Sequence, residues 1–139
     1  MIVLDTNVLS ALTRPVPDQA VRTWLDAQPS LSIWTTAVTL FELRIGIAIM
    51  PEGRRRAALE EIADRIVDEI LERRVLPFDT PAAEASAILA AVRRRQGRPG
   101  ELRDTMIAGI VIARRATLAT RNTRHFADLT VPVVNPWAD

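Results

Sequence analysis

Short runs of β-forming residues alternate with helix-length segments along this chain of 139 residues. The runs lie at 2–4, 31–34, 75–78, 117–120 and 131–134. We expect helices between them at 8–12, 18–29, 37–50, 54–74, 80–95 and 102–113. Strands that alternate with helices, with no hairpin signal, favour a parallel sheet covered by helices. The sequence therefore predicts an α/β fold, and without a repeat or linker we expect one domain over 1–139.

The expected helices differ in how they should pack. The 37–50 helix is apolar on nearly every side, which predicts that it is buried. The 54–74 helix has apolar residues at spacings of three and four with charges between them, which is typical of an amphipathic surface helix. Asp18 is expected to cap the second helix. Thr80 is expected to cap the 80–95 helix, with Pro81 at its first position.

Composition excludes several kinds of chemistry. The chain has no cysteine and one histidine, so thiolate zinc sites, thiol nucleophiles and histidine clusters are excluded. A metal would be held by oxygen, which favours magnesium or manganese. Every basic residue is arginine, which suits phosphate binding but also follows from a GC-rich genome. Without lysine, P-loop and Schiff-base enzymes are excluded.

Charge and hydropathy bear on partners and location. The net charge of +1 is too balanced to identify a nucleic-acid binder. No apolar run approaches the roughly 18 residues of a membrane span, and the N-terminus does not resemble a signal peptide. The sequence therefore predicts a cytoplasmic protein with no membrane partner.

Three acids stand apart from those on amphipathic helix faces. Asp5 ends the first strand, where sites form in parallel sheets; Glu42 lies inside an apolar helix; Asp104 opens another. Each has an ordinary explanation on its own: a helix cap, a salt bridge to a distant arginine, and an acid favoured by the helix dipole. The nearest charge to Glu42 is Arg44, which points to another side of the helix. A shared divalent cation explains all three acids together.

Four motifs in this order resemble those of PIN-domain ribonucleases, and most closely VapC-type toxins of toxin-antitoxin pairs, including the FitB-like branch. A first strand ends in Asp-Thr-Asn, a Glu-Leu pair lies in a helix after the second strand, an Asp precedes an Ile-Ala pair, and Ala-Thr-Arg-Asn-Thr follows the last helix. The motifs begin at Asp5, Glu42, Asp104 and Ala119, and the chain nearly ends in Asn135-Pro136-Trp137, as FitB-like chains tend to do.

The resemblance implies a three-layer α/β/α sandwich with a central, mainly parallel sheet. It implies that Asp5, Glu42 and Asp104 bind Mg²⁺ or Mn²⁺ and hydrolyse RNA by a metal-activated water. Glu42 would bind the metal directly or through water and help take the proton. The family often has a fourth acid near Asn122; an amide brings no charge, so we favour one tightly held ion.

The resemblance also implies partners and supporting residues. A small antitoxin commonly wraps such toxins and places a basic side chain in the acidic pocket, and the toxins commonly dimerise. The 54–74 helix would be part of that clamp or an ordinary surface helix. Thr6 or Thr120 would bind the scissile phosphate or serve as a cap or strand-end hydroxyl. The other supporting residues are Asn7 and Asn122, the candidate RNA contacts are Arg93, Arg94, Arg95, Arg98, Arg121 and Arg124, and His125 is expected to be a surface loop residue.

Other classes of protein also have an Asp at the end of a strand. A haloacid-dehalogenase-type phosphotransferase needs a second Asp where Asn7 stands, and a response-regulator receiver needs a lysine. A sister nuclease that cuts DNA flaps remains open, although that group usually has more acids. An inactive, dimeric interaction module, whose acidic pocket only receives a partner's arginine, also remains open because of Asn122.

Overall fold

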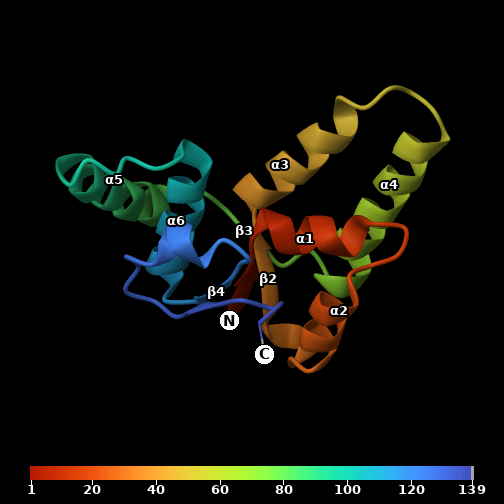
Figure 1. Cartoon of the computed structure of the whole chain (residues 1–139), viewed down its shortest axis with the longest axis horizontal. Coiled ribbons are helices and arrows are strands. Elements are labelled where there is room, and N and C mark those ends of the chain that lie inside the picture. The colour runs from red at the N-terminus through yellow and green to blue at the C-terminus, as the bar shows by residue number, and fades with distance from the viewer. Residues whose placement is uncertain (139) are drawn as a thin grey trace.

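Five parallel strands form the centre of the molecule in the computed structural model, which describes residues 1–138 (Figure 1). Their order is β3-β2-β1-β4-β5, so β1 lies in the middle and pairs with β2 and β4. This confirms the predicted parallel α/β fold. The strands are β1 (Ile2–Leu4), β2 (Ile33–Thr36), β3 (Val75–Leu76), β4 (Thr117–Ala119) and β5 (Val133–Val134).

Helices cover both faces of this sheet. Figure 1 shows α5 and α6 on one side and α1, α2 and α4 on the other, with α3 extending away from the sheet. Two hydrophobic clusters separate the layers, one under each group of helices. The helices are α1 (Thr6–Thr13), α2 (Gln19–Asp26), α3 (Ala37–Ala48), α4 (Arg54–Arg65), α5 (Thr80–Arg95) and α6 (Leu102–Arg114). The three-layer arrangement is therefore as predicted.

Strand β1 is buried on both faces, which explains its continuous run of β-branched and aliphatic residues. Val3 packs in the cluster beneath α6, whereas Leu4 packs in the cluster beneath α1. Alternate residues of a strand point to opposite faces, so both must be apolar here. The buried strand places the residue that follows it, Asp5, at the carboxyl edge of the sheet.

Several predicted boundaries are corrected by the structure. Strand β2 starts at Ile33 because 30–32 form the short 3-10 helix η1 (Ser30–Ser32). The predicted 54–74 helix changes at its end into the π-helical η2 (Ile66–Ile70). Asp79 rather than Thr80 caps α5, since its carboxylate accepts a hydrogen bond from the amide of Ala82 at 3.1 Å. Asp18 caps α2, as predicted.

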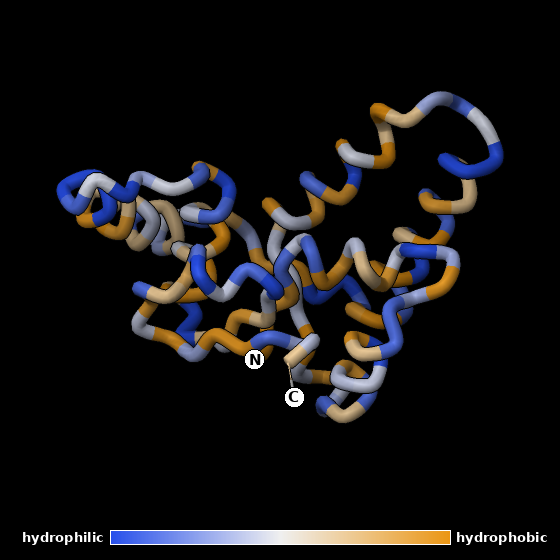
Figure 2. The backbone as a smooth tube through the Cα atoms, viewed as in Figure 1, coloured by the Kyte–Doolittle hydropathy of each residue, from blue (hydrophilic) through white to orange (hydrophobic). Residues whose placement is uncertain are grey.

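The prediction that the 37–50 helix is buried was wrong for one of its sides. Leu43 and Ile47 are buried, but Phe41 is 54% exposed and Ile49 is 75% exposed. Figure 2 shows hydrophobic segments along α3 as far as its outer end. Apolar residues all round a helix predict burial, and here the chain itself covers only one side.

Helices α5 and α6 pack closely because Gly109 has no side chain. A Cβ at this position would lie 2.6 Å from the carbonyl oxygen of Ala82 and 2.8 Å from the Cβ of Ser86. Close contact along Gly109 holds α6 against α5, and Asp104 lies in the first turn of α6. Within residues 1–138, no helix combines the length and hydrophobicity needed to cross a membrane.

Candidate metal centre

Asp5 is fixed at the end of β1 and is only 3% exposed. Its Oδ1 accepts a hydrogen bond from the Thr6 amide at 2.8 Å, and its Oδ2 accepts one from the Thr120 hydroxyl at 2.8 Å. Burial raises the pKa of Asp5 despite these hydrogen bonds, and the charges of Asp104 and Glu42 raise it further. The three carboxylates therefore repel one another in the absence of a cation.

Glu42 lies in the second turn of α3 and lines the same pocket as Asp5. Its Oε1 accepts a hydrogen bond from the Thr6 hydroxyl at 2.8 Å. Arg44 points away and pairs with Asp64 at 2.8 Å, as expected from its position on the helix. The alternative explanation of Glu42, a salt bridge to a distant arginine, is met in part by Arg103, whose Nη1 lies 3.6 Å from Oε2 of Glu42. This distance is too long for a hydrogen bond, so Arg103 balances the charge loosely.

Asp104 comes from α6 and is partly buried. The helix is capped by Glu101, whose carboxylate accepts a hydrogen bond from the Asp104 amide at 3.1 Å, so capping does not explain Asp104. Oδ2 of Asp104 lies 3.2 Å from Nδ1 of His125. Burial and the charge of Glu101 raise the pKa of Asp104, while His125 and Arg93 act in the opposite direction.

The three carboxylates line one hollow, of about 350 Å³, which we call the acidic hollow. They reach it from β1, α3 and α6, which are far apart in sequence. Its lining residues are Asp5, Thr6, Asn7, Ser10, Arg14, Glu42, Asp104, Arg121, Asn122 and Trp137.

The acidic hollow offers oxygen donors but no preformed metal cage. Across residues 1–138, no three carboxylate or imidazole side chains are grouped tightly enough to hold an ion on their own. Mg²⁺ commonly keeps several waters and takes only one or two carboxylates, so the donor set fits such an ion. Burial, and to a lesser extent the charges of Asp104 and Glu42, raise the pKa of Asp5, and a cation at this place would offset both effects.

The supporting residues mainly hold the carboxylates. Thr120 is fully buried and donates its hydroxyl to Asp5, and Thr6 donates its hydroxyl to Glu42. The expectation that one of these hydroxyls binds the scissile phosphate stays a prediction. Asn7 donates to Asp5 at 3.3 Å and to Thr120 at 3.2 Å, and accepts from the Arg121 amide at 3.0 Å. Asn122 lines the acidic hollow, as the resemblance implied.

The candidate RNA contacts lie in three different surroundings. Arg93 is 4% exposed, and its guanidinium donates to both carboxylate oxygens of Asp128 at 2.8 Å. The prediction that Arg93 contacts RNA is therefore corrected, because its charge is used inside the protein. Arg121 lines the acidic hollow and lies 4.8 Å above the Trp137 ring. The others, Arg94, Arg95, Arg98 and Arg124, are exposed.

Comparisons with known proteins agree over the whole chain. A family model described as the PIN domain matches residues 2–131. The VapC ribonuclease Y4jK of Sinorhizobium fredii is 40% identical over 137 residues, which are 99% of this chain and 98% of that protein. Toxin FitB of Neisseria gonorrhoeae is 35% identical over 139 residues, with 100% of both chains covered.

Solved structures show the same likeness. The crystal structure of FitAcB from Neisseria gonorrhoeae matches with a TM-score of 0.90 and 34% identity over 100% of both chains. VapBC-5 from Mycobacterium tuberculosis, a member of the VapBC family of toxin-antitoxin systems, matches with a TM-score of 0.68 and 26% identity over 96% of both chains.

The fold, the carboxylates at the sheet edge and these matches show that the chain belongs to the PIN-domain family. Within that family it is a VapC- and FitB-type toxin of a toxin-antitoxin system, which confirms the resemblance seen in the sequence.

Proposed function

We propose that this toxin is a metal-dependent endoribonuclease whose metal ligands are Asp5, Glu42 and Asp104. The observation that carries the proposal is that these acids, from three separate elements, line one hollow. The similarity to a VapC ribonuclease supports RNA as the substrate. The supply of oxygen donors alone supports Mg²⁺ or Mn²⁺ as the ion.

The chain's own residues have distinct roles in this proposal. A bound divalent ion would lower the pKa of a water molecule and neutralise charge on phosphate oxygens. Asp5 is held rigidly by Thr6 and Thr120, so it fixes one side of the site. Asp104 comes from α6 and adds a second negative charge to the site. Glu42 is positioned by the Thr6 hydroxyl and is the candidate to accept a proton.

Incubation of the purified chain, free of partner protein, with total cellular RNA tests the proposal. We expect cleavage with Mg²⁺ or Mn²⁺ and none with EDTA, and sequencing of the new RNA ends would identify the substrate. The rival reading, an inactive interaction module, is favoured by Asn122 and by the nearness of Arg103 to Glu42. If the folded chain cleaved no RNA with either ion, the result would support the inactive interaction module and contradict the proposed nuclease.

An antitoxin partner follows from the family, and we propose that it inhibits by entering the acidic hollow. A basic side chain placed there would relieve the repulsion that raises the pKa of Asp5. We expect the chain bound to its antitoxin to cleave RNA much more slowly than the free chain. A complex that cuts at the full rate would contradict this.

We also propose that a second copy of the chain covers the exposed side of α3. Phe41, Ile45 and Ile49 recur every four residues and form one apolar stripe, and Ile88 and Val92 form a similar pair on α5. Exposed apolar residues in such an arrangement favour association with another protein surface over contact with solvent. Ile45→Glu is expected to change the mass measured by light scattering from two chains to one. A wild-type mass of one chain would contradict the proposal.

A further inference from the structure

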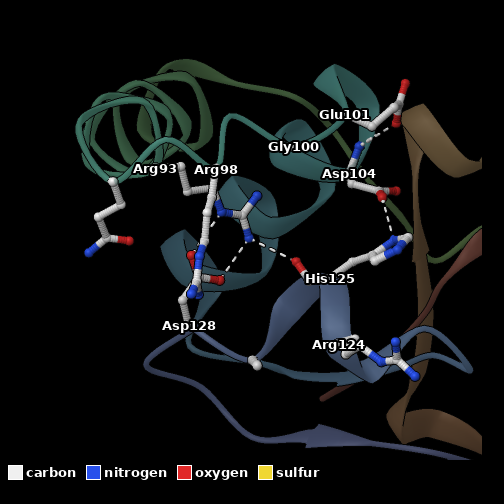
Figure 3. A pocket seen from close by; sticks show the side chains of 10 residues that line it. Arg93, Arg98, Gly100, Glu101, Asp104, Arg124, His125 and Asp128 are labelled. Carbon is white, nitrogen blue, oxygen red and sulfur yellow. Dashed lines mark hydrogen bonds and ion pairs between the residues drawn. The ribbon is translucent and has the colours of Figure 1, made fainter.

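A second hollow, of about 270 Å³, adjoins the acidic hollow and shares Asp104 with it (Figure 3). It lies between the segment that joins α5 to α6 and the short 3-10 helix η3 (Thr123–Phe126). Because Asp104 lines both hollows, an extended ligand that passes the proposed metal ligands also reaches the second one. We call it the arginine hollow; the residues that line it include Arg93, Arg98, Arg124 and His125.

The base of the arginine hollow is rigid and internally neutral. Arg93 donates to both oxygens of Asp128 and also to the backbone carbonyl of His125 at 3.0 Å, as Figure 3 shows. This two-pronged pairing holds α5 and the segment after η3 together. The charges of Arg93 and Asp128 therefore cancel, and neither is available to a ligand.

Two other arginines retain their charge. Arg98 and Arg124 are exposed, and among residues 1–138 neither has a carboxylate within the 4.0 Å of a salt bridge. Figure 3 shows Arg98 extending toward Asp128, but both oxygens of that carboxylate already accept hydrogen bonds from Arg93. Both arginines line the arginine hollow, and guanidinium groups without a carboxylate partner suit a phosphate.

The wall next to Asp104 is an imidazole ring. Nδ1 of His125 is held at 3.2 Å from Asp104, while most of the side chain stays exposed. Aromatic and histidine rings serve as stacking surfaces for unpaired RNA bases. Thus the arginine hollow presents a flat ring beside the carboxylates and two unpaired guanidinium groups farther away.

We propose that the arginine hollow binds the nucleotide next to the scissile phosphate, with its base near His125 and its own phosphate at Arg98 and Arg124. This inference rests on the proposed endoribonuclease function. It adds a defined substrate class, single-stranded RNA that extends at least one nucleotide beyond the cut. The small volume favours one unpaired nucleotide over a base pair.

The test separates binding from cleavage. Binding of a single-stranded RNA of about ten nucleotides is measured in EDTA at several salt concentrations, for wild type, Arg98→Met and Arg124→Met. Each lost phosphate contact should reduce the slope of log Kd against log salt by about 0.7. Arg55→Met is the matched control, because Arg55 is exposed on α4 and lines neither this hollow nor the acidic hollow. Its slope should equal that of wild type.

Cleavage kinetics supply the second measurement. With Mn²⁺, Arg98→Met and Arg124→Met should raise KM several-fold on RNA that extends beyond the cut, and leave kcat close to the Arg55→Met value. Slopes and KM values equal to that control would overturn the inference, even if wild type cleaves RNA. The inference would also be overturned if Arg98→Met and Arg124→Met bound RNA normally but bound the antitoxin more weakly. Failure of wild type to cleave would instead count against the proposed function, while the binding slopes still test the hollow.

Discussion

Asp104→Asn is expected to reduce metal-dependent RNA cleavage by at least about 100-fold while the fold stays intact. The amide keeps the size of the side chain but removes its charge, and with it one of the three proposed metal ligands that line the acidic hollow. The fold should survive, because Asp104 is not the cap of α6 and, among residues 1–138, its carboxylate has a hydrogen bond or ion pair only with the exposed His125. Initial rates with Mn²⁺ at matched protein concentrations check this.

The thermal stability of Asp104→Asn provides an independent test of how its charge is placed. Burial and neighbouring charge raise the pKa of Asp104. Its ionised form is therefore less favourable in the folded protein than in the unfolded chain, and this cost is present near neutral pH. Removing the charge should therefore leave the metal-free protein equally or more stable in thermal unfolding. Glu84→Gln, an exposed change on α5, is the control and should cleave at the wild-type rate. Full activity of Asp104→Asn would exclude this residue from the site.

Gly109→Ala is expected to destabilise the protein by about 3 kcal/mol, near the upper end for overpacking. The new methyl group would lie 2.6 Å from a backbone oxygen of α5, which cannot rotate away as a side chain can. The two helices would have to separate along their contact. The change should lower the melting temperature by roughly 10 °C for a chain of this size. Thermal unfolding followed by circular dichroism measures it.

A matched glycine elsewhere should give the opposite result. Gly46 lies in α3 with nothing within 4 Å of an added Cβ, so Gly46→Ala should stabilise the protein by about 0.5–1 kcal/mol. Ser86→Gly combined with Gly109→Ala should recover part of the loss, because it removes the nearest side chain. Similar melting temperatures for Gly109→Ala and Gly46→Ala would show that α5 and α6 do not pack as described.

The sheet and the acidic hollow could be predicted because local sequence patterns identify the strands, and parallel strands all end at the same edge of a sheet. Apolar runs such as 2–4 and 117–120 must be strands buried between helices, and parallel strands end at one edge. Asp5 was therefore placed from the sequence, and Glu42 stood out as an acid in an apolar helix. That Asp104 lines the same hollow followed from the family resemblance rather than from any local rule.

The contacts between distant side chains were not predictable. Arg93 and Asp128 are 35 positions apart, and an Arg-Arg-Arg end of a helix looks the same whether one member is buried or not. The nearness of Arg103 to Glu42 depends on where α6 begins relative to α3. The prediction that the 37–50 helix is buried failed on one side for another reason. Hydrophobic patterning does not distinguish burial within a chain from burial against another molecule.

Calorimetric titration of the metal-free chain with Mn²⁺ tests most directly whether the carboxylates hold a divalent ion. We expect one ion to bind per wild-type chain, and binding to be lost in both Asp5→Asn and Asp104→Asn but retained in Glu84→Gln. A wild-type chain that binds no Mn²⁺, or an Asp5→Asn chain that binds it as tightly as wild type, would contradict a metal centre in the acidic hollow.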